Sequence, residues 1–488
     1  MRGPPHAIGG RLVTRLVIVG NGMAGARLAE EVRRRDPAVS VEITVFGAER
    51  HPAYNRVLLS SVLSGSLAPE LVRLPEPPNV DRRIGVAVCE INRTARRVTA
   101  ADGSTVDYDV LVLATGSRSW LPPTEGLLGE DREPAPGVVA FRTMDDCARI
   151  LDLARPGARV AVLGGGLLGV EAARGLAGRG CRVTVVHPVG HLMERQLDPA
   201  AAAVLARTLA ALGIEFRFGV LAARYLPGDG LKLDDGGLVD ADLVVVAAGV
   251  KPQTALAEAA GLAVDRGILV DDSLRTNDPS VHAMGDCARH PGTVSGLVQP
   301  AWEQASVLAD LVTGENPAAR YLGTPVLTRL KARDVDLAAL GEVHVDADST
   351  DAEVLCLQDP TRGRYAKLVL REGLVAGAIV LGAPDTAAAI IQLYDRRVPA
   401  PSDRLVLLLG SGAATAAHTP AELPAAALVC RCNTVTKGQL VSAWRRGARG
   451  LGGLVTSTRA TTGCGGCRDT VRGIADWLSA AEPVEGAG

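Results

Sequence analysis

The amino-acid sequence predicts an α/β protein that is divided into several domains. Its length of 488 residues corresponds to about three or four domains of ordinary size. An apolar strand followed by a glycine-rich turn and a helix occurs twice, first near residue 20 and again near residue 164. Two pairs of cysteines follow a Pro- and Ala-rich segment near the carboxyl end, which indicates a further small unit.

The composition is that of a globular protein without a charged partner. Hydrophobic residues make up 47% and charged residues 22% of the chain, and the net charge is −2. This balance gives no electrostatic argument for binding nucleic acid or an anionic membrane. The sequence has no apolar run of transmembrane length and no signal-peptide pattern at its start. We therefore expect a cytoplasmic, reducing location, where cysteines act as free thiols or ligands.

The first glycine-rich turn lies in "RLVIVGNGMAGARLAEEV". An apolar strand over residues 16–19 leads into Gly20-x-Gly22-x-x-Gly25, a helix and a second strand. The glycines permit a tight turn and the close approach of a pyrophosphate to the helix N-terminus. This context predicts a dinucleotide site. Glu49, after the second strand, is a candidate to bind the adenosine ribose, although a solvated loop glutamate is the alternative interpretation.

The second turn repeats the pattern as Gly164-x-Gly166-x-x-Gly169, again between a strand and a helix. The repetition favours a protein with two dinucleotide cofactors. The following strand ends at His187, where an acid would bind the 2′-hydroxyl of NAD. Its absence leaves NADH and NADPH open, and an exposed strand-end residue is the alternative role for His187.

Three arginines lie near His187 in the sequence, namely Arg179, Arg182 and Arg195. Positive charge near the end of that strand could accept the 2′-phosphate of NADPH. However, Pro188 and not an arginine follows His187, and a neutral imidazole can bind a 2′-hydroxyl.

Further segments complete a recognisable order. "YDVLVLATGSRSWLP" and "ADLVVVAAGVKPQT" are apolar strands that end in small-residue turns, "SVHAMGDCARH" places Asp286 after a short strand, and "LVQPAWEQASVLADLV" is helical. Over about residues 14 to 320 the chain resembles the flavoproteins of the pyridine nucleotide–disulfide oxidoreductase superfamily. This resemblance implies FAD on the first unit (12–120 and 240–320) and NAD(P)H on the second (121–239), inserted into the first.

The resemblance also implies individual roles. Asp286 would bind the FAD ribitol, the helix that begins with "PAWEQA" would lie by the flavin, and Glu171 would be a catalytic residue near the nicotinamide. Together the motifs and the resemblance indicate these cofactor-binding residues: Gly20, Gly22, Met23, Ala24, Gly25, Glu49, Arg56, Ser60, Ala114, Thr115, Gly116, Gly164, Gly166, Leu167, Leu168, Gly169, His187, Gly249, Gly285, Asp286 and Trp302.

The segment "ERHPAYNRVLLSSVLSG" indicates which members of the superfamily the chain resembles. It is similar to the FAD-contacting segment of ferredoxin-type, rubredoxin-type and nitrite reductases. Arg56 in this segment could stabilise negative charge on the flavin or the pyrophosphate, and a surface arginine is the alternative. Ser61 stands where many ferredoxin reductases carry a lysine, so we do not expect lysine-assisted flavin chemistry.

The cysteines indicate where electrons leave. Before residue 430 no two cysteines have the spacing of a redox dithiol, and we interpret the five isolated ones as small, mostly buried hydrophobic residues: Cys89, Cys147, Cys181, Cys287 and Cys356. Only Cys287, beside Asp286, is a candidate to approach the flavin. A disulfide within Cys430-x-Cys432 would be strained, and 31 residues separate this pair from Cys464-x-x-Cys467.

The two late pairs resemble the bacterioferritin-associated ferredoxin-like domain. That resemblance implies a 2Fe–2S cluster bound through Cys430, Cys432, Cys464 and Cys467. A zinc site of four cysteines and a redox disulfide are the alternatives. Between the two ends of the chain we expect a small reductase domain (321–400, with a hairpin around Glu372-Gly373), a linker (401–426) and then the helical cluster domain (427–482).

The full order predicts two nested Rossmann-like domains, a small α+β domain and a helical 2Fe–2S domain. It is similar to the electron-transfer subunit of assimilatory nitrate reductase and to the N-terminal half of the nitrite reductase large subunit. Because the chain ends at Gly488 without a siroheme half, we expect it not to reduce nitrite itself.

We expect an NAD(P)H-dependent reductase, with NADH favoured by the resemblance, that passes electrons to a molybdenum nitrate reductase catalytic subunit. The alternatives are the FAD/2Fe–2S subunit of an opine- or amino-acid-oxidising complex, a stand-alone ferredoxin- or rubredoxin-type reductase, and a non-catalytic redox sensor.

Overall fold

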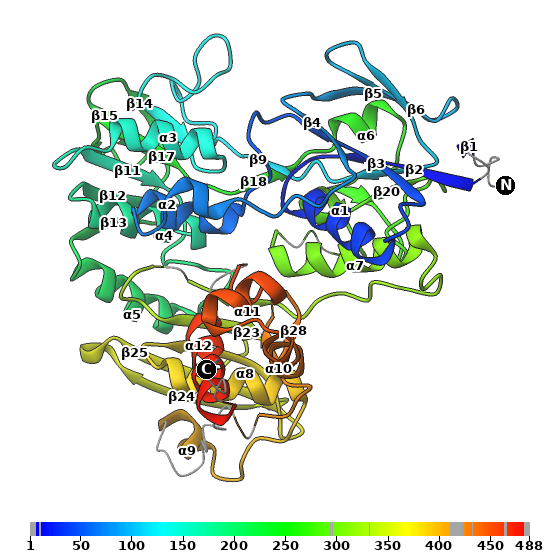
Figure 1. Ribbon diagram of the computed structural model, residues 1–488. Helices are drawn as coiled ribbons and strands as arrows, with labels where there is room; N and C mark the ends of the chain where they lie inside the picture. Colours follow the sequence, from blue (N-terminus) through cyan, green and yellow to red (C-terminus); the bar gives the residue numbers. More distant parts are fainter. Residues whose placement is uncertain are drawn as a thin grey trace, which may run out of the picture.

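The computed structural model places two parallel sheets side by side above two smaller units (Figure 1). It describes residues 6–8, 11–292, 294, 296–330, 332–409, 421, 423–431, 433–462 and 466–482. Within this part of the chain, none of the helices is long and apolar enough to cross a membrane.

The first sheet has the strand order β20-β8-β2-β3-β4, and all of these neighbours are parallel. Its strands are β2 (Arg11–Val19), β3 (Val41–Gly47), β4 (Asp81–Ile84), β8 (Val110–Leu113) and β20 (Val281–Ala283), with β1 (His6–Ile8) added antiparallel to β2. The helices α1 (Met23–Arg35) and α7 (Val298–Thr313) pack on each other beside this sheet. Residues 16–19 are therefore buried, as expected of a parallel sheet covered on both faces.

The second sheet is also parallel, in the order β10-β17-β11-β12-β13. Its strands are β10 (Val138–Ala140), β11 (Arg159–Leu163), β12 (Arg182–His187), β13 (Ile214–Phe218) and β17 (Leu243–Val246). The helices α3 (Met144–Leu153), α4 (Leu167–Gly178) and α5 (Pro199–Ala210) belong to this unit. A capping box between Thr143 and Asp146 begins α3, and the Asp198 side chain caps α5.

The chain leaves the first unit and returns to it through two paired strands. β9 (Ser117–Ser119) runs outward, β18 (Val250–Pro252) runs back, and the two are antiparallel. The nested arrangement predicted from the sequence is confirmed. The predicted return at residue 240 is too early, because β17 still pairs in the second sheet. A short apolar strand does not itself show which sheet it joins, since that depends on its partners.

Two antiparallel meanders extend the units. β5 (Val88–Asn92), β6 (Arg97–Ala100) and β7 (Thr105–Asp107) extend the first, and β14 (Ala222–Leu226), β15 (Gly230–Leu233) and β16 (Leu238–Asp240) extend the second. Shorter elements near the first unit are α6 (Ala255–Ala259), β19 (Ile268–Leu269) and β21 (Ala288–Arg289). The short helix α2 (Leu59–Leu63) packs instead on α3 and α4 of the second unit.

The small reductase domain is an antiparallel sheet in the order β22-β23-β26-β25-β24. It contains β22 (Leu327–Arg329), β23 (Leu337–Gly341), β24 (Glu353–Asp359), β25 (Arg364–Arg371), β26 (Leu374–Leu381) and α8 (Pro384–Arg396). The predicted hairpin joins β25 to β26, with Glu372 and Gly373 at positive φ. The segment expected to be a plain linker contains α9 (Arg404–Leu409), whose Leu407 and Leu408 pack on this domain. Residues 410–420 and 422 lie outside the described part.

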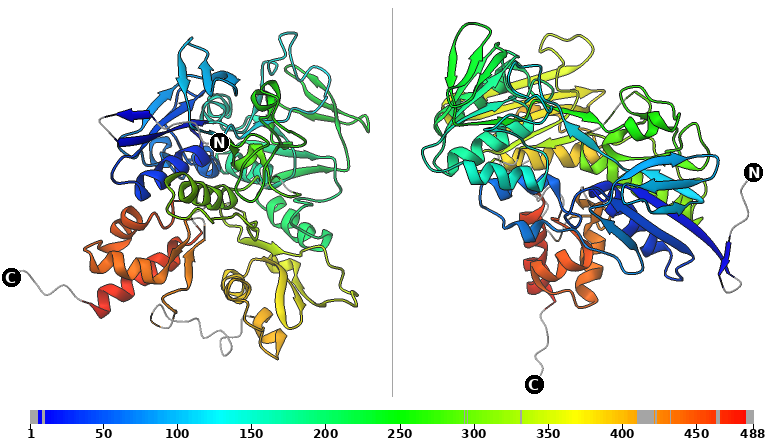
Figure 2. Two further views of the ribbon diagram at one scale, coloured as in Figure 1. Left: turned by 90° about the vertical axis from the view of Figure 1, so that its right-hand side faces the viewer. Right: turned by 90° about the horizontal axis from the view of Figure 1, so that it is seen from above.

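The last domain is small and mainly helical. It contains β27 (Leu428–Cys430), β28 (Val435–Thr436), α10 (Lys437–Arg445), α11 (Gly450–Thr458) and α12 (Arg468–Ala481). A capping box between Thr436 and Gln439 begins α10. Figure 2 shows this domain beside the first unit and apart from the sheet of the small reductase domain.

Three of the isolated cysteines are buried as predicted, namely Cys147, Cys181 and Cys287. The prediction of burial was wrong for Cys89 and Cys356, which are exposed. Both lie on antiparallel strands at the edge of their sheets, β5 and β24, where alternate side chains face solvent. Cys287 donates to the carbonyls of Leu113 and Met284, and burial raises the pKa of its thiol. It is therefore held as a protonated thiol within the core.

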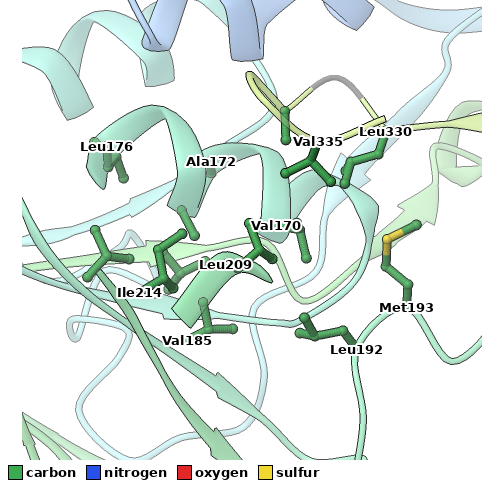
Figure 3. Close-up of a cluster of buried hydrophobic side chains, with 14 of the residues drawn as sticks. Val170, Ala172, Leu176, Val185, Leu192, Met193, Leu209, Ile214, Leu330 and Val335 are labelled. Carbon is green, nitrogen blue, oxygen red and sulfur yellow. The ribbon is translucent and has the colours of Figure 1, made fainter. Parts of the chain in front are cut away.

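One core joins the second unit to the small reductase domain. Figure 3 shows Leu330 and Val335 of the small domain near Val170 and Ala172 of α4. A polar bridge accompanies this contact. The Asp198 carboxylate accepts from Tyr365 Oη at 2.7 Å and from the buried Lys367 Nζ at 3.1 Å. The same carboxylate accepts from the Ala201 amide and so ties the bridge to the start of α5.

We predict that Asp198→Asn destabilises the protein by about 3 kcal/mol, because it leaves the Lys367 ammonium buried without its charged partner. The amide keeps an acceptor for the Ala201 N–H, so the helix cap is retained. Urea unfolding of the holoenzyme, followed by circular dichroism, measures the change. Asp242→Asn is the control, since Asp242 forms a half-exposed pair with Arg159 and should cost about 1 kcal/mol or less. Equal effects of the two changes would contradict the prediction.

Candidate functional site

A cavity of about 950 Å³ lies at the carboxyl ends of the strands of the first sheet. β2 is its central strand, with β3 on one side and β8 on the other, and open α/β sheets bind ligands at such a point. We call this space the large cavity. Eleven of the residues predicted to bind a cofactor line it: Gly20, Gly22, Met23, Ala24, Glu49, Arg56, Ala114, Thr115, Gly116, Gly285 and Asp286.

Two glycines of the first turn, Gly20 and Gly25, have no room for a side chain. A Cβ on Gly20 would lie 2.1 Å from the Ala114 carbonyl oxygen, and φ of Gly20 is +120°. A Cβ on Gly25 would lie 1.9 Å from the Gly20 carbonyl oxygen. The turn therefore brings the N-terminus of α1 against the cavity, where unpaired amide groups can bind a pyrophosphate.

Glu49 is held by two residues of the Tyr54-Asn55-Arg56 segment. Tyr54 Oη donates to Glu49 at 2.7 Å, and the Arg56 guanidinium forms an ion pair with the same carboxylate. The guanidinium carbon also lies 5.0 Å from the centre of the Tyr54 ring. Burial raises the pKa of Tyr54, so its hydroxyl remains a donor at neutral pH. Glu49 is thus part of an ordered cluster at the cavity wall and not an isolated loop glutamate.

Arg142 is a site residue that sequence reasoning missed. Its guanidinium donates to Asp286 at 2.6 Å and to Ser117 Oγ, and Ser117 Oγ donates to Asp286 at 2.9 Å. Arg142 follows the last strand residues of β10 and precedes the capping box of α3. A basic residue between a buried strand and a helix start is the only sequence signal that could have identified it.

A second space of about 340 Å³, which we call the junction cavity, lies where the domains meet. Arg56 and Arg142 line both cavities, so the two spaces adjoin each other. Leu167, Leu168 and the buried Glu171 line the junction cavity from the start of α4. Side chains of α8 and of the last domain complete its wall, and Cys430 and Cys467 are among them.

The other predicted cofactor residues line neither of these two cavities: Gly25, Ser60, Gly164, Gly166, Gly169, His187, Gly249 and Trp302. Gly164 repeats the geometry of Gly20, because its Cβ would lie 2.4 Å from the Ala247 carbonyl oxygen. Gly249 has a φ of +111° just after β17. Ser60 is buried in α2, and its hydroxyl has no hydrogen-bond partner among the described residues.

His187 is buried, with 5% of its surface exposed, so the alternative of an exposed strand-end residue is wrong. The Gly165 N–H donates to its Nδ1 at 3.1 Å, and its Nε2 lies 3.2 Å from Glu194 Oε2. Two of the nearby arginines are at the opposite end of the strand. Arg182 begins β12, about 16 Å from His187 at the usual rise of a strand, and Arg179 reaches Gly65. Neither can contribute to a phosphate site beside His187.

The cysteines of the last domain lie close to donors. Asn433 Nδ2 lies 3.7 Å from Cys430 Sγ, and the pKa of Cys430 is lowered to about 6 by a hydrogen bond from Cys467 together with backbone donors from Thr461 and Asn433. A site that favours a thiolate fits a metal or cluster ligand. Cys432 and Cys464 lie outside the described residues, and the described part alone contains no group of three metal-binding side chains.

Residues 14–305 match the family described as pyridine nucleotide-disulphide oxidoreductase, which is more than half of the chain. The chain belongs to this oxidoreductase family. Residues 326–396 match the rubredoxin NAD+ reductase C-terminal domain, and residues 428–477 match the BFD-like 2Fe–2S binding domain. The protein is therefore an NAD(P)H-dependent oxidoreductase with FAD and a 2Fe–2S cluster as its cofactors. When bound, the flavin converts two-electron hydride chemistry into single-electron transfer.

The assimilatory nitrate reductase electron transfer subunit of Bacillus subtilis (strain 168) is 34% identical, over 96% of this chain and 60% of that protein. The NADH nitrite reductase large subunit of Escherichia coli (strain K12) is 33% identical, over 96% of this chain and 56% of that protein. The chain thus spans only 56% to 60% of the length of these relatives. A rubredoxin-NAD(+) reductase of Alcanivorax borkumensis is 34% identical, over 72% of this chain and 93% of that protein.

Among solved structures, putidaredoxin reductase in its covalent complex with putidaredoxin resembles the chain with a TM-score of 0.71. That likeness covers 83% of this chain and 99% of the other, at 25% identity. It supports the overall fold described above for this oxidoreductase.

Trp302 of this oxidoreductase holds the 2Fe–2S domain against the FAD domain. Its indole is buried in the apolar core of the 2Fe–2S domain and donates to the Met23 carbonyl at 3.3 Å. The guanidinium carbons of Arg27 and Arg459 lie 5.2 and 5.7 Å from the ring centre. Arg459 of the 2Fe–2S domain also forms an ion pair with Glu30 of α1. The residue predicted to bind a cofactor thus connects two domains.

Two further contacts fix the docked position. Asn55 Nδ2 donates to the carbonyl of Thr462, and Arg431 forms an ion pair with Asp395 of α8 at 2.7 Å. Burial, together with the neighbouring Arg27 cation, lowers the pKa of Arg459 to about 10. Arg459 nevertheless stays charged at neutral pH, so the cation–π contact and the ion pair persist there.

We predict that Trp302→Ala loosens this docking, because truncation of a buried tryptophan costs about 3–5 kcal/mol of packing. Stopped-flow absorbance after mixing with NADH should show normal flavin reduction and slower cluster reduction. Trp477→Ala is the matched control, since Trp477 of α12 contacts Lys437 within the 2Fe–2S domain. If both variants reduced the cluster at the wild-type rate, Trp302 would have no role in docking.

Proposed function

We propose that this oxidoreductase is the electron-transfer subunit of an assimilatory nitrate reductase, which oxidises NAD(P)H and supplies electrons to a molybdenum catalytic subunit. One observation carries the proposal. Cys430 and Cys467 line the same junction cavity as Glu171 and as Arg56 of the flavin-binding segment. The proposed nicotinamide, flavin and cluster sites would therefore adjoin one another in this chain, as the delivery of single electrons from NAD(P)H requires.

Each of the three cofactors would be held by its own set of residues. The glycine turn of α1, with Glu49, Arg56 and Asp286, would hold FAD in the large cavity. The start of α4 would hold the nicotinamide end of NAD(P)H, with Glu171 on the wall of the junction cavity. Cys430, Cys432, Cys464 and Cys467 would bind the cluster through four thiolates, and the donors around Cys430 favour its thiolate form.

The Bacillus subtilis relative favours nitrate reductase as the acceptor, because that relative is the electron transfer subunit of an assimilatory nitrate reductase. The nitrite reductases are similarly close, at 33% and 34% identity, so a siroheme-containing nitrite reductase is the second candidate acceptor. The opine-oxidising alternative needs no nicotinamide site, whereas this chain has a complete second glycine turn at the end of β11.

We predict that Cys432→Ala loses iron and labile sulfide but keeps stoichiometric FAD, because neither Cys430 nor Cys467 is among the described residues that line the large cavity. Metal analysis and flavin absorbance of anaerobically purified protein measure both. The variant should still oxidise NADH with a small soluble quinone that reaches the flavin directly. Cys356→Ala is the control, because Cys356 is exposed on β24 and distant in sequence from both pairs. Stoichiometric zinc without iron in the wild-type protein would overturn the cluster assignment.

We predict NADH-dependent nitrite formation when the wild-type protein is mixed with a molybdenum nitrate reductase catalytic subunit from the same source. The Cys432→Ala variant should support less than about a tenth of this rate, because electrons have no exit through the cluster. Anaerobic titration with NADH precedes the assay and excludes an opine-driven or non-catalytic protein if the flavin bleaches. Electron delivery to a siroheme nitrite reductase but not to the nitrate enzyme would establish the second candidate.

A further inference from the structure

The end of β12 carries a histidine where dinucleotide-binding folds usually carry an acid that binds the adenosine ribose. The His187 side chain does more than mark the ribose position. Its ring also packs against the second glycine turn. A Cβ on Gly165 would lie 2.9 Å from both Cγ and Cδ2 of the ring. The imidazole therefore fills the space between the glycine turn and the strand end.

The hydrogen bonds of His187 fix its tautomer. The Gly165 N–H donates to Nδ1, so Nδ1 carries no proton when the ring is neutral. Burial lowers the pKa of His187, which keeps the ring neutral at pH 7. The proton then lies on Nε2, which donates to Glu194 Oε2 at 3.2 Å. His187 thus connects the glycine turn to a carboxylate seven residues further along the chain.

The loop that carries Glu194 is held rigidly. The Met193 N–H donates to the Gly165 carbonyl at 2.9 Å, and the Leu197 N–H donates to the Met193 carbonyl at 2.9 Å. Leu192, Met193 and Leu197 are fully buried, and Leu192 and Met193 come from the same loop after β12 (Figure 3). The Glu194 side chain, between these anchors, remains 34% exposed. Within the described part of the chain, no ion pair or hydrogen bond other than that from His187 reaches its carboxylate.

We propose that Glu194 is the specificity-determining residue for NADH: its carboxylate accepts from the 2′-hydroxyl of the adenosine ribose and repels the 2′-phosphate of NADPH. His187 is the positioning residue that orients this carboxylate and ties it to the glycine turn. This inference rests on the NAD(P)H-dependent reaction and is independent of the protein that receives the electrons.

The charged residues around Glu194 favour binding of the 2′-hydroxyl of NADH over the 2′-phosphate of NADPH. Arg182 lies at the far end of β12, and Arg217, near the strand end on β13, is paired with Asp235 at 2.8 Å. Arg195 is the exposed neighbour of Glu194, and its own carbonyl accepts from His344. A 2′-phosphate beside Glu194 would therefore meet one negative charge and one solvated arginine.

The test compares the FAD- and cluster-loaded wild-type protein with Glu194→Gln. Isothermal titration calorimetry with ADP-ribose and with 2′-phospho-ADP-ribose measures binding without any electron transfer. We expect Glu194→Gln to weaken ADP-ribose binding by about tenfold, the usual effect of losing a hydrogen bond to a charged group. Binding of the 2′-phosphorylated compound should strengthen, and the ratio kcat/KM for NADH over NADPH should fall by about tenfold or more.

Glu215→Gln is the matched control, because Glu215 lies in the same domain but at the opposite end of the sheet, in register with Thr184. It should leave both affinities unchanged. Glu194→Asp keeps the charge on a shorter side chain and should weaken ADP-ribose binding while still rejecting the phosphate. His187→Asn keeps an acceptor for the Gly165 N–H but is too short to reach Glu194, so selectivity should fall although the carboxylate remains.

Unchanged affinity for ADP-ribose and unchanged NADH selectivity in Glu194→Gln would overturn the proposal. A wild-type preference for NADPH would overturn it equally. FAD content and the unfolding midpoint of each variant show that the domain is intact. Failure to reduce the nitrate reductase subunit would reject the proposed partner but would leave these binding results in place.

Discussion

The close approach of a glycine to the end of the adjacent strand is the constraint on which both coenzyme sites depend. Gly20 abuts the carbonyl oxygen of Ala114, and Gly164 abuts that of Ala247, with no space for a Cβ in either place. Each contact turns the chain sharply and aims a helix N-terminus at the carboxyl edge of its sheet. The residues proposed to bind FAD and NAD(P)H, such as Asp286 and Glu171, could act on the coenzymes only because these two turns would place the coenzymes beside them.

The position of the 2Fe–2S domain depends on a different kind of contact. An apolar surface alone would permit many docked orientations, whereas Trp302 contacts two guanidinium groups that come from different domains. Burying Arg27 and Arg459 is unfavourable unless each finds a charged partner, and Glu31 and Glu30 of α1 supply them. This requirement selects one orientation, in which Cys430 and Cys467 face the junction cavity.

Local signals made most of the fold predictable from the sequence. Glycine turns, apolar strands and the hairpin at Glu372 depend on a few consecutive residues, and the structure confirms the nested sheets and that hairpin. Pairing between distant strands is not local, which is why β17 was assigned to the wrong unit. Trp302 shows a second limit. Successive residues of a helix point about 100° apart, so Ala301 lines the large cavity while Trp302 faces another domain.

The strand end at His187 shows the same limit within one site. When position 187 is considered alone, a histidine in place of an acid removes the expected contact to the ribose. The choice between NADH and NADPH then stays open. The loop after β12 comes back to the glycine turn, where the Met193 N–H donates to the Gly165 carbonyl. This places the Glu194 carboxylate beside His187. The chemistry therefore belongs to the pair of His187 and Glu194. Because a hydrogen bond between non-adjacent residues creates it, no reading of the strand alone could have predicted it.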